Sequence, residues 1–137
     1  MPPMDWKLEV VVVPVSDVDR AKSFYVDQVG FGLDVDHDQG NGFRVVQMTP
    51  PGSGCSVTIG TGLVDSAPGS LKGLQLVVDD IDAARAQLAE RGVDVSPIRN
   101  FGPDGWQDGR GGRWNSFIFF ADPDGNAWTV QERPAEG

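Results

Sequence analysis

The sequence is poor in the two residues that most often hold metal ions. Among 137 residues it contains one cysteine, Cys55, and one histidine, His37. One cysteine excludes an internal disulfide and a cysteine-rich metal site, and one histidine excludes every site that needs two. The scarcity of cysteine also favours a reducing cytoplasm as the compartment.

Long apolar runs and an excess of positive charge are also missing. The longest apolar run, residues 10–15, is far shorter than the roughly 20 residues that a membrane span needs. No basic stretch followed by an apolar region opens the chain, so we expect no signal peptide. Eleven Lys and Arg against 20 Asp and Glu give a net charge of −9. We therefore expect no nucleic-acid partner and no anionic membrane partner.

The hydrophobic pattern predicts the same series of elements twice. β-branched and alternating stretches predict strands, and capped three-to-four spacing predicts helices. In the first series we expect a strand at 8–15 and a helix that begins at Ser16 or Asp17 and ends at about residue 28. Three strands follow, at 31–36, 43–49 and 55–60. After a Gly/Pro/Ser connection we expect a strand, a helix and three further strands, at 73–78, about 81–91, 93–98, 116–121 and 127–132. Segments 15–19 and 78–82 align at an offset of 63 residues.

This repetition predicts an α+β fold made of two βαβββ repeats. We expect a curved mixed sheet around a cleft, with the helices on its outer face. The chain is read as a single domain, 1–137. Its first repeat covers about 6–62, a linker about 61–72, and the second repeat about 73–133.

The layout resembles the vicinal oxygen chelate superfamily, which includes glyoxalase I, bleomycin resistance proteins and extradiol dioxygenases. The resemblance is carried by five segments of the sequence, 13–17 with Arg20, 24–25, 29–31, 77–80 and 122–126. It implies metal ligands at Val10, Gly73 and Thr129, with a further position near Ser56 or Thr58. Val10 and Gly73 have no ligating side chain and neutral Thr129 is a poor ligand, so we expect no metal and no cofactor.

Strand alternation predicts which residues line the cleft. If Val10 faces the cleft, every second residue of its strand faces the cleft too, and so do alternate residues of the other predicted strands. The predicted lining is Leu8, Val10, Val12, Ser56, Thr58, Gly73, Gln75, Val77, Ala127, Thr129 and Gln131. Trp128 and Val130 are then left for the core. This lining is apolar and neutral-polar, which suits a small amphipathic molecule.

A glycine-rich segment, 100–115, carries the remaining candidates. It holds Trp106, Arg110, Arg113 and Trp114, and an aromatic ring with an arginine can enclose an organic anion. One interpretation is an irregular loop that acts as a ligand-binding lid. The other is a structural loop whose tryptophans pack on the domain or on a second subunit.

Other polar residues have simpler explanations. We expect His37 to lie at a solvated strand end and Cys55 to be a small packing residue. Asp79 and Asp80 precede the second helix and are expected to cap it.

The sequence thus predicts a metal-independent small-molecule binding protein of the glyoxalase/bleomycin-resistance type, with an amphipathic or aromatic ligand. Two alternatives stay open: a cofactor-free lyase or isomerase, with Arg110, Arg113 or Asp108 acting on a substrate, and a metal-dependent lyase or dioxygenase. Four tryptophans in a small chain also favour a homodimer. The sequence identifies neither the ligand nor the geometry of the dimer.

Overall fold

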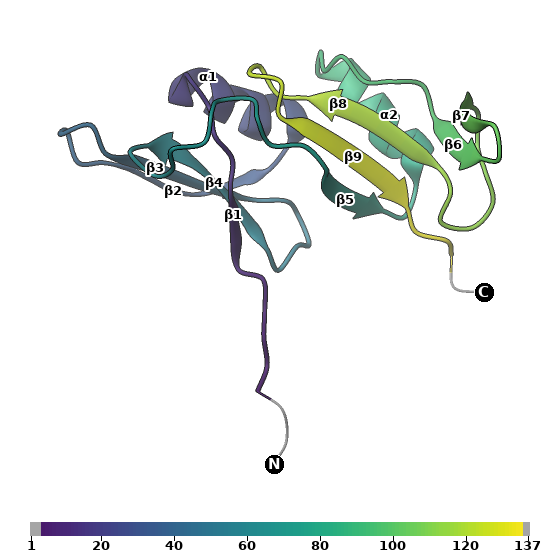
Figure 1. Cartoon of the computed structure of the whole chain (residues 1–137), viewed down its shortest axis with the longest axis horizontal. Coiled ribbons are helices and arrows are strands. Elements are labelled where there is room, and N and C mark those ends of the chain that lie inside the picture. The colour runs from purple at the N-terminus through teal and green to yellow at the C-terminus, as the bar shows by residue number, and fades with distance from the viewer. Residues whose placement is uncertain (1–3, 136–137) are drawn as a thin grey trace. The chain divides into compact units, whose positions relative to one another are not determined.

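The structure of the protein, a computed structural model, describes residues 4–135 (Figure 1). Its contacts divide the chain into two compact units, Met1–Ala67 and Pro68–Gly137. The boundary falls inside the predicted linker. No helix among the described residues is long and apolar enough to cross a membrane. That the whole chain is one domain stays a prediction.

Unit 1 has the predicted βαβββ order. Strand β1 (Val10–Val12) precedes helix α1 (Val18–Ser23), which continues as the π-helical turn η1 (Phe24–Val29). Three strands follow, β2 (Gly32–Asp38), β3 (Arg44–Thr49) and β4 (Ser56–Thr61). They form a sheet in the order β1-β4-β3-β2, in which β1 is parallel to β4 and the other pairs are antiparallel.

Unit 2 repeats this plan with one strand more. It contains β5 (Leu74–Val78), helix α2 (Ile81–Glu90), β6 (Arg99–Gly102), β7 (Gly105–Asp108), β8 (Phe117–Ala121) and β9 (Ala127–Glu132). The sheet order is β5-β9-β8-β6-β7, with β5 parallel to β9. Two mixed sheets and their helices confirm the α+β class and the repeat.

Two aspartates begin the helices at equivalent points of the repeats. The Asp17 side chain accepts a hydrogen bond from the Arg20 amide at 3.1 Å, and the Asp80 side chain accepts one from the Ala83 amide at 3.0 Å. Each bond satisfies one of the N–H groups that have no partner inside the helix. The capping role expected for Asp80 is therefore confirmed.

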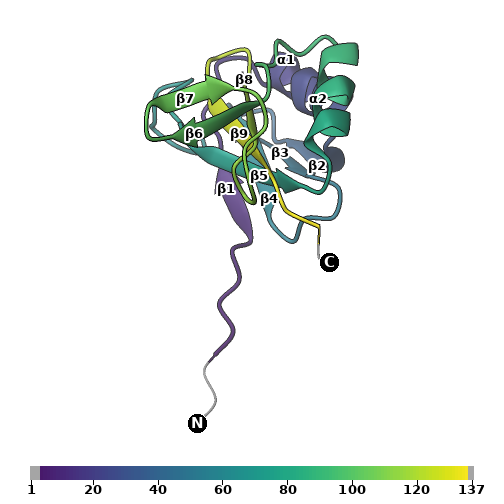
Figure 2. The ribbon, with the colours of Figure 1, turned by 90° about the vertical axis from the view of Figure 1, so that its right-hand side faces the viewer.

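Alternation along the strands gives each sheet one buried face. Helix α1 contacts β4 in unit 1, and α2 contacts β8 and β9 in unit 2 (Figure 2). The buried apolar strand residues are Val46, Met48, Val57 and Ile59 in unit 1 and Ile118, Phe120, Trp128 and Val130 in unit 2. Ser56 and Thr58, on the opposite face of β4, are also buried. The core positions predicted for Trp128 and Val130 are confirmed.

The segment before the last hairpin differs from expectation. Residues 93–98 are not a strand, and the extra strands come from β6 and β7, which pair as a hairpin inside the segment expected to be an irregular loop. Residues 93–98 are held against β8 by a backbone hydrogen bond, in which the Ser96 amide donates to the Phe119 carbonyl at 3.0 Å. Pro97 has no N–H to donate to a strand ladder, which favours an irregular path there.

Candidate functional site

We call the face of each sheet that is turned away from its helix the open face. On the open face of unit 2, four aromatic rings form a cluster. Trp106 lies edge-on to Phe101, Phe117 and Phe119, with ring centroids 5.2, 5.2 and 5.1 Å away. Phe101 is 56% exposed and Trp106 is 48% exposed. This ring cluster, Phe101, Trp106, Phe117 and Phe119, therefore presents aromatic surface to solvent.

Strand register places uncharged polar side chains beside the ring cluster. Thr129 on β9 lies opposite Phe119, and Gln131 lies opposite Phe117. Gln75 on β5 donates from its Nε2 to the Gln131 Oε1 at 2.8 Å. The open face of unit 2 thus combines rings with a row of amide and hydroxyl groups, as small-molecule sites commonly do.

The three arginines near this face have different surroundings. Arg99 lies opposite Phe117 in the β6–β8 register and pairs with Asp108 at 3.3 Å, at the border of the ring cluster. Arg110 instead pairs with Asp82, at 2.8 Å, and with Glu132. These contacts place Arg110 beside the start of α2, on the helix side of the sheet.

The Glu132 carboxylate has a second role that fixes this arrangement. Its Oε2 accepts a hydrogen bond from the Ile81 amide at the start of α2, at 3.0 Å. The hydrogen bond of Arg110 to Glu132 raises the pKa of the arginine above its usual value. Arg110 and Trp106 therefore do not share one face of the sheet. Arg113 is exposed on a turn and belongs neither to the ring cluster nor to the ion pairs of Arg110.

The segment 100–115 is ordered in spite of its glycines. The Asn115 side chain accepts from the Phe101 amide and donates to the Phe101 carbonyl, both at 2.9 Å, as a neighbouring strand would. The Asn100 side chain donates to the Gly109 carbonyl at 3.0 Å. The Trp114 carbonyl accepts from Gln131 Nε2 at 2.8 Å. The expectation of an irregular loop is corrected to a hairpin and a tied turn, and the ligand-binding role of the segment stays a prediction.

The open face of unit 1 holds the other predicted residues. In the parallel β1–β4 pair, Val10 lies beside Ser56 and Val12 beside Thr58, so all four side chains point to the same face. The hydroxyls of Ser56 and Thr49 are 2.7 Å apart, and Thr49 also donates to the Asp34 carboxylate. This face is aliphatic and hydroxylic, with no aromatic ring among the predicted residues.

The donor set does not fit a divalent metal. Within residues 4–135, no three His, Cys, Asp or Glu side chains gather as metal ligands. The positions at which the superfamily places ligands carry Val10, Gly73 and Thr129, which offer one hydroxyl between them. His37 is an exposed residue of β2, and the Cys55 thiol contacts the Ser56 carbonyl at 3.6 Å.

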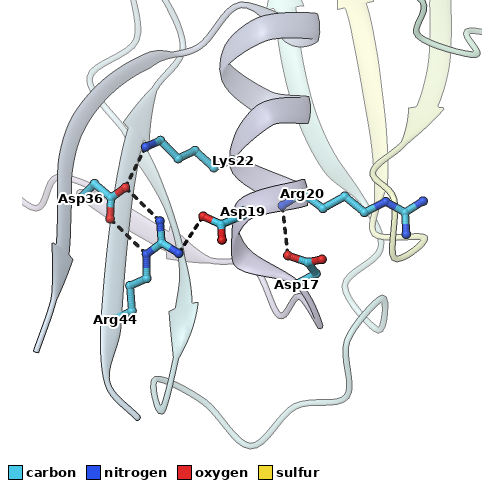
Figure 3. Close-up of polar contacts among 6 residues, drawn as sticks. All are labelled: Asp17, Asp19, Arg20, Lys22, Asp36 and Arg44. Atoms are coloured by element: carbon cyan, nitrogen blue, oxygen red, sulfur yellow. Dashed lines mark hydrogen bonds and ion pairs between the residues drawn. The ribbon is translucent and has the colours of Figure 1, made fainter. Parts of the chain in front are cut away.

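The strongest charge cluster lies on the helix side of unit 1 (Figure 3). Asp36 accepts from Lys22 at 2.7 Å and from two Arg44 nitrogens at 3.1 and 3.0 Å, and Arg44 also reaches Asp19 at 2.9 Å. Hydrogen bonds from Arg44 and then Lys22 lower the pKa of Asp36 to about 2. This ion-pair network ties α1 to β2 and β3, and its guanidinium is already engaged by two carboxylates.

Paired repeats of this kind, with open sheet faces and capped helices, define a class of small α+β proteins. A family model of the Glyoxalase/Bleomycin resistance protein/Dioxygenase superfamily matches residues 7–130. The chain belongs to this superfamily, and the resemblance noted in the sequence is confirmed.

Solved structures and a curated relative agree with this assignment. TnmS3, an antibiotic binding protein from Streptomyces sp. CB03234, is 36% identical, with a TM-score of 0.77 over 96% of this chain and 99% of that chain. A glyoxalase/bleomycin resistance protein from the same organism is 38% identical, with a TM-score of 0.72 over 91% and 99%. The uncharacterized protein YetH of Bacillus subtilis (strain 168) is 24% identical over 92% of this chain and 98% of its own.

Sequence reasoning identified one of the four members of the ring cluster, Trp106, and missed the other three. Phe117 and Phe119 were recognised only as part of a strand, and Phe101 was not singled out. The signal was present in the alternation of residues 116–121, because Ile118 and Phe120 on the core face leave Phe117 and Phe119 for the open face.

Proposed function

We propose that the protein binds a small aromatic or amphipathic molecule on the open face of unit 2, without a metal ion, and acts by sequestration. The observation that carries this proposal is the exposed ring cluster around Trp106. A soluble chain that leaves several large rings exposed side by side forgoes their burial, which argues for a surface used in binding. The TnmS3 protein, described as antibiotic binding, has the same fold at 36% identity and supports this reading.

The chemistry of the face defines the kind of ligand. Rings of Trp106 and Phe119 favour stacked or edge-on contact with an aromatic ligand. The side chains of Gln75, Thr129 and Gln131 offer neutral donors and acceptors, and Arg99 at the border offers a cation. The predicted contribution of Arg110, Arg113 and Trp114 is not needed in this proposal, and a cytoplasmic homodimer stays part of it.

The proposal is tested with a defined aromatic probe, the sulfonated naphthalene dye ANS, and a thermal-shift screen of aromatic and anionic metabolites. We expect ANS or a screened compound to bind with a stoichiometry of one per chain in the presence of EDTA. Mass spectrometry of the compound recovered after incubation separates sequestration from catalysis. Unchanged compound supports sequestration, and steady conversion to a product supports the lyase or isomerase alternative. Loss of binding in EDTA contradicts metal independence.

A further inference from the structure

A cavity of about 500 Å³ lies on the helix side of unit 2, between α2 and the segments that flank the hairpin of β6 and β7. Its lining consists of Asp82, Arg85, Ala86, Pro97, Ile98 and residues 108–110. No member of the ring cluster belongs to this lining. The volume is that of an ordinary small-molecule site, and the proposed function makes no use of it.

Arg85 differs from the other partly buried cations of the protein. Among the described residues, four Lys and Arg are half-buried. Three of them, Lys22, Arg44 and Arg99, each pair with an aspartate. Within residues 4–135 no carboxylate forms an ion pair with Arg85. Because partial burial removes water from a charge, an opposite charge beside it is favourable, and here the protein itself does not supply one.

The guanidinium of Arg85 is held in a fixed position. Its Nε donates to the Ser96 carbonyl at 2.8 Å. Ser96 is in turn fixed to β8, because its amide donates to the Phe119 carbonyl and its hydroxyl accepts from the Phe119 amide, both at 3.0 Å. No acceptor among the described residues takes a hydrogen bond from the two terminal nitrogens of Arg85. These nitrogens lie in one plane and match the two oxygens of a carboxylate.

The other charged groups of the cavity are already balanced. Arg110 pairs with Asp82 at 2.8 Å and with Glu132, and Asp108 pairs with Arg99 at 3.3 Å. One positive charge is therefore left over, so a ligand with one negative charge completes the balance. A dianion such as inorganic phosphate is disfavoured, because its second charge would lie beside the aspartates of the wall.

We propose that this cavity binds a free organic monocarboxylate with an apolar chain. The carboxylate accepts two hydrogen bonds from the terminal nitrogens of Arg85. The apolar chain lies against Ala86, Pro97 and Ile98, which supply the uncharged part of the lining. This second site is independent of the function proposed for the open face, because no aromatic ring takes part in it.

The probe for this site is hexanoate, which has no ring for the ring cluster to stack on. It is titrated into the full chain labelled with nitrogen-15, and amide chemical shifts and the Nε–Hε resonance of Arg85 are followed. We expect saturable binding with a dissociation constant of about 1 mM. The shifts should centre on the cavity lining and on the Arg85 resonance. Neutral hexanamide should bind at least tenfold more weakly.

Three outcomes of this titration overturn the proposal. They are shifts centred on the ring cluster, equal binding of hexanamide, and no saturable binding up to about 10 mM, tenfold above the expected constant. Binding of ANS or another aromatic compound to the open face is measured separately, so failure of one site leaves the other unaffected.

Substitutions test the role of Arg85 directly. Arg85→Gln removes the charge and the planar pair of donors and should weaken hexanoate binding at least tenfold. Arg113→Gln makes the same change of charge at an exposed arginine outside the cavity and is the matched control, with an expected change below twofold. An equal loss in both variants overturns the proposal, because it indicates attraction by net charge alone.

A third variant keeps Arg85 and fills the cavity. Ala86 is exposed on α2 and lines the cavity, so Ala86→Trp occupies the space without disturbing the core. It should weaken hexanoate binding at least tenfold, and it decides the question if Arg85→Gln does not fold. Unchanged affinity in a filled variant whose circular dichroism matches the parent overturns the proposal.

Discussion

The two repeats share their scaffold and differ in the side chains that they display. Both begin with a strand, cap a helix with an aspartate and end in an antiparallel hairpin. On the open faces, unit 1 has the exposed Val10 and the buried Thr58 where unit 2 has the ring cluster and its amides. The helix sides differ as well, with an ion-pair network in unit 1. The comparison teaches that the backbone plan is retained while the ring cluster occurs on one open face only among the described residues.

The last hairpin turn of each repeat gives the largest expected difference in stability. In unit 2 the Asn126 side chain is fully buried. It donates to Asp122 at 2.7 Å and accepts from the Leu71 amide at 3.1 Å. Asn126→Ala removes both bonds and leaves buried polar groups without partners. We expect it to lower the free energy of unfolding by about 2–4 kcal/mol in urea denaturation.

The matched variant in unit 1 is Ser53→Ala, in the exposed turn between β3 and β4. The Ser53 hydroxyl bonds only to its neighbour Cys55, through the Cys55 amide at 3.0 Å and its carbonyl at 2.9 Å. Water can replace these bonds, so the expected loss is below about 1 kcal/mol. Equal losses at the two turns would show that burial of the turn in unit 2 is not what stabilises it.

The contrast between the faces predicts the next effect, on binding. Trp106→Ala removes the central ring of the cluster and should weaken ANS binding on unit 2 about 5- to 30-fold, because one stacked ring contributes about 1–2 kcal/mol. Arg110→Ala, on the helix side, should change the dissociation constant less than twofold. Fluorescence titration measures both, and circular dichroism checks that each variant is folded. Reversed effects would move the site to the helix side of unit 2.

The sequence predicted the core face of the strands, but it did not predict the contacts that shape the segment 100–115. Alternation correctly assigned Trp128 and Val130 to the core, because period-two patterning in a strand needs no tertiary information. The hairpin of β6 and β7 was missed because glycines predict freedom of the backbone. Here Asn115 supplies tertiary hydrogen bonds to Phe101 that a local pattern does not reveal. The ion pair that draws Arg110 to Glu132 spans 22 residues and was equally invisible.

The charge network of unit 1 predicts an acid-dependent loss of stability. Asp36 has its pKa lowered to about 2, against an ordinary value of 3.8, so its charged form is favoured in the folded state. A lowered pKa stabilises the fold above the unfolded pKa, and this contribution is lost as pH falls from about 4 to about 2. The Asp36 side chain is partly exposed, so after allowance for solvent screening we expect Asp36→Asn to cost about 1–2 kcal/mol at pH 7.

The measurement is urea denaturation of both proteins from pH 7 to pH 2. The difference between parent and Asp36→Asn should shrink as pH falls from about 4 and be mostly lost at pH 2, where Asp36 is about half protonated in the folded state and almost fully protonated in the unfolded state. Asp27 is an exposed carboxylate in η1, the continuation of α1. Asp27→Asn is the matched control and should show no such trend. A difference that persists unchanged at pH 2 would contradict an electrostatic origin.

The equivalent helix caps give the smallest expected effect and test whether the units unfold together. Asp17→Ala and Asp80→Ala each leave one helical N–H without its acceptor and should cost about 1 kcal/mol. Three of the four tryptophans lie in unit 2, so tryptophan fluorescence reports mainly on that unit, whereas far-ultraviolet circular dichroism reports on both. If unfolding is two-state, either variant shifts the two signals by the same amount. If the units unfold separately, Asp17→Ala shifts the circular dichroism curve and leaves the fluorescence midpoint in place, while Asp80→Ala shifts both.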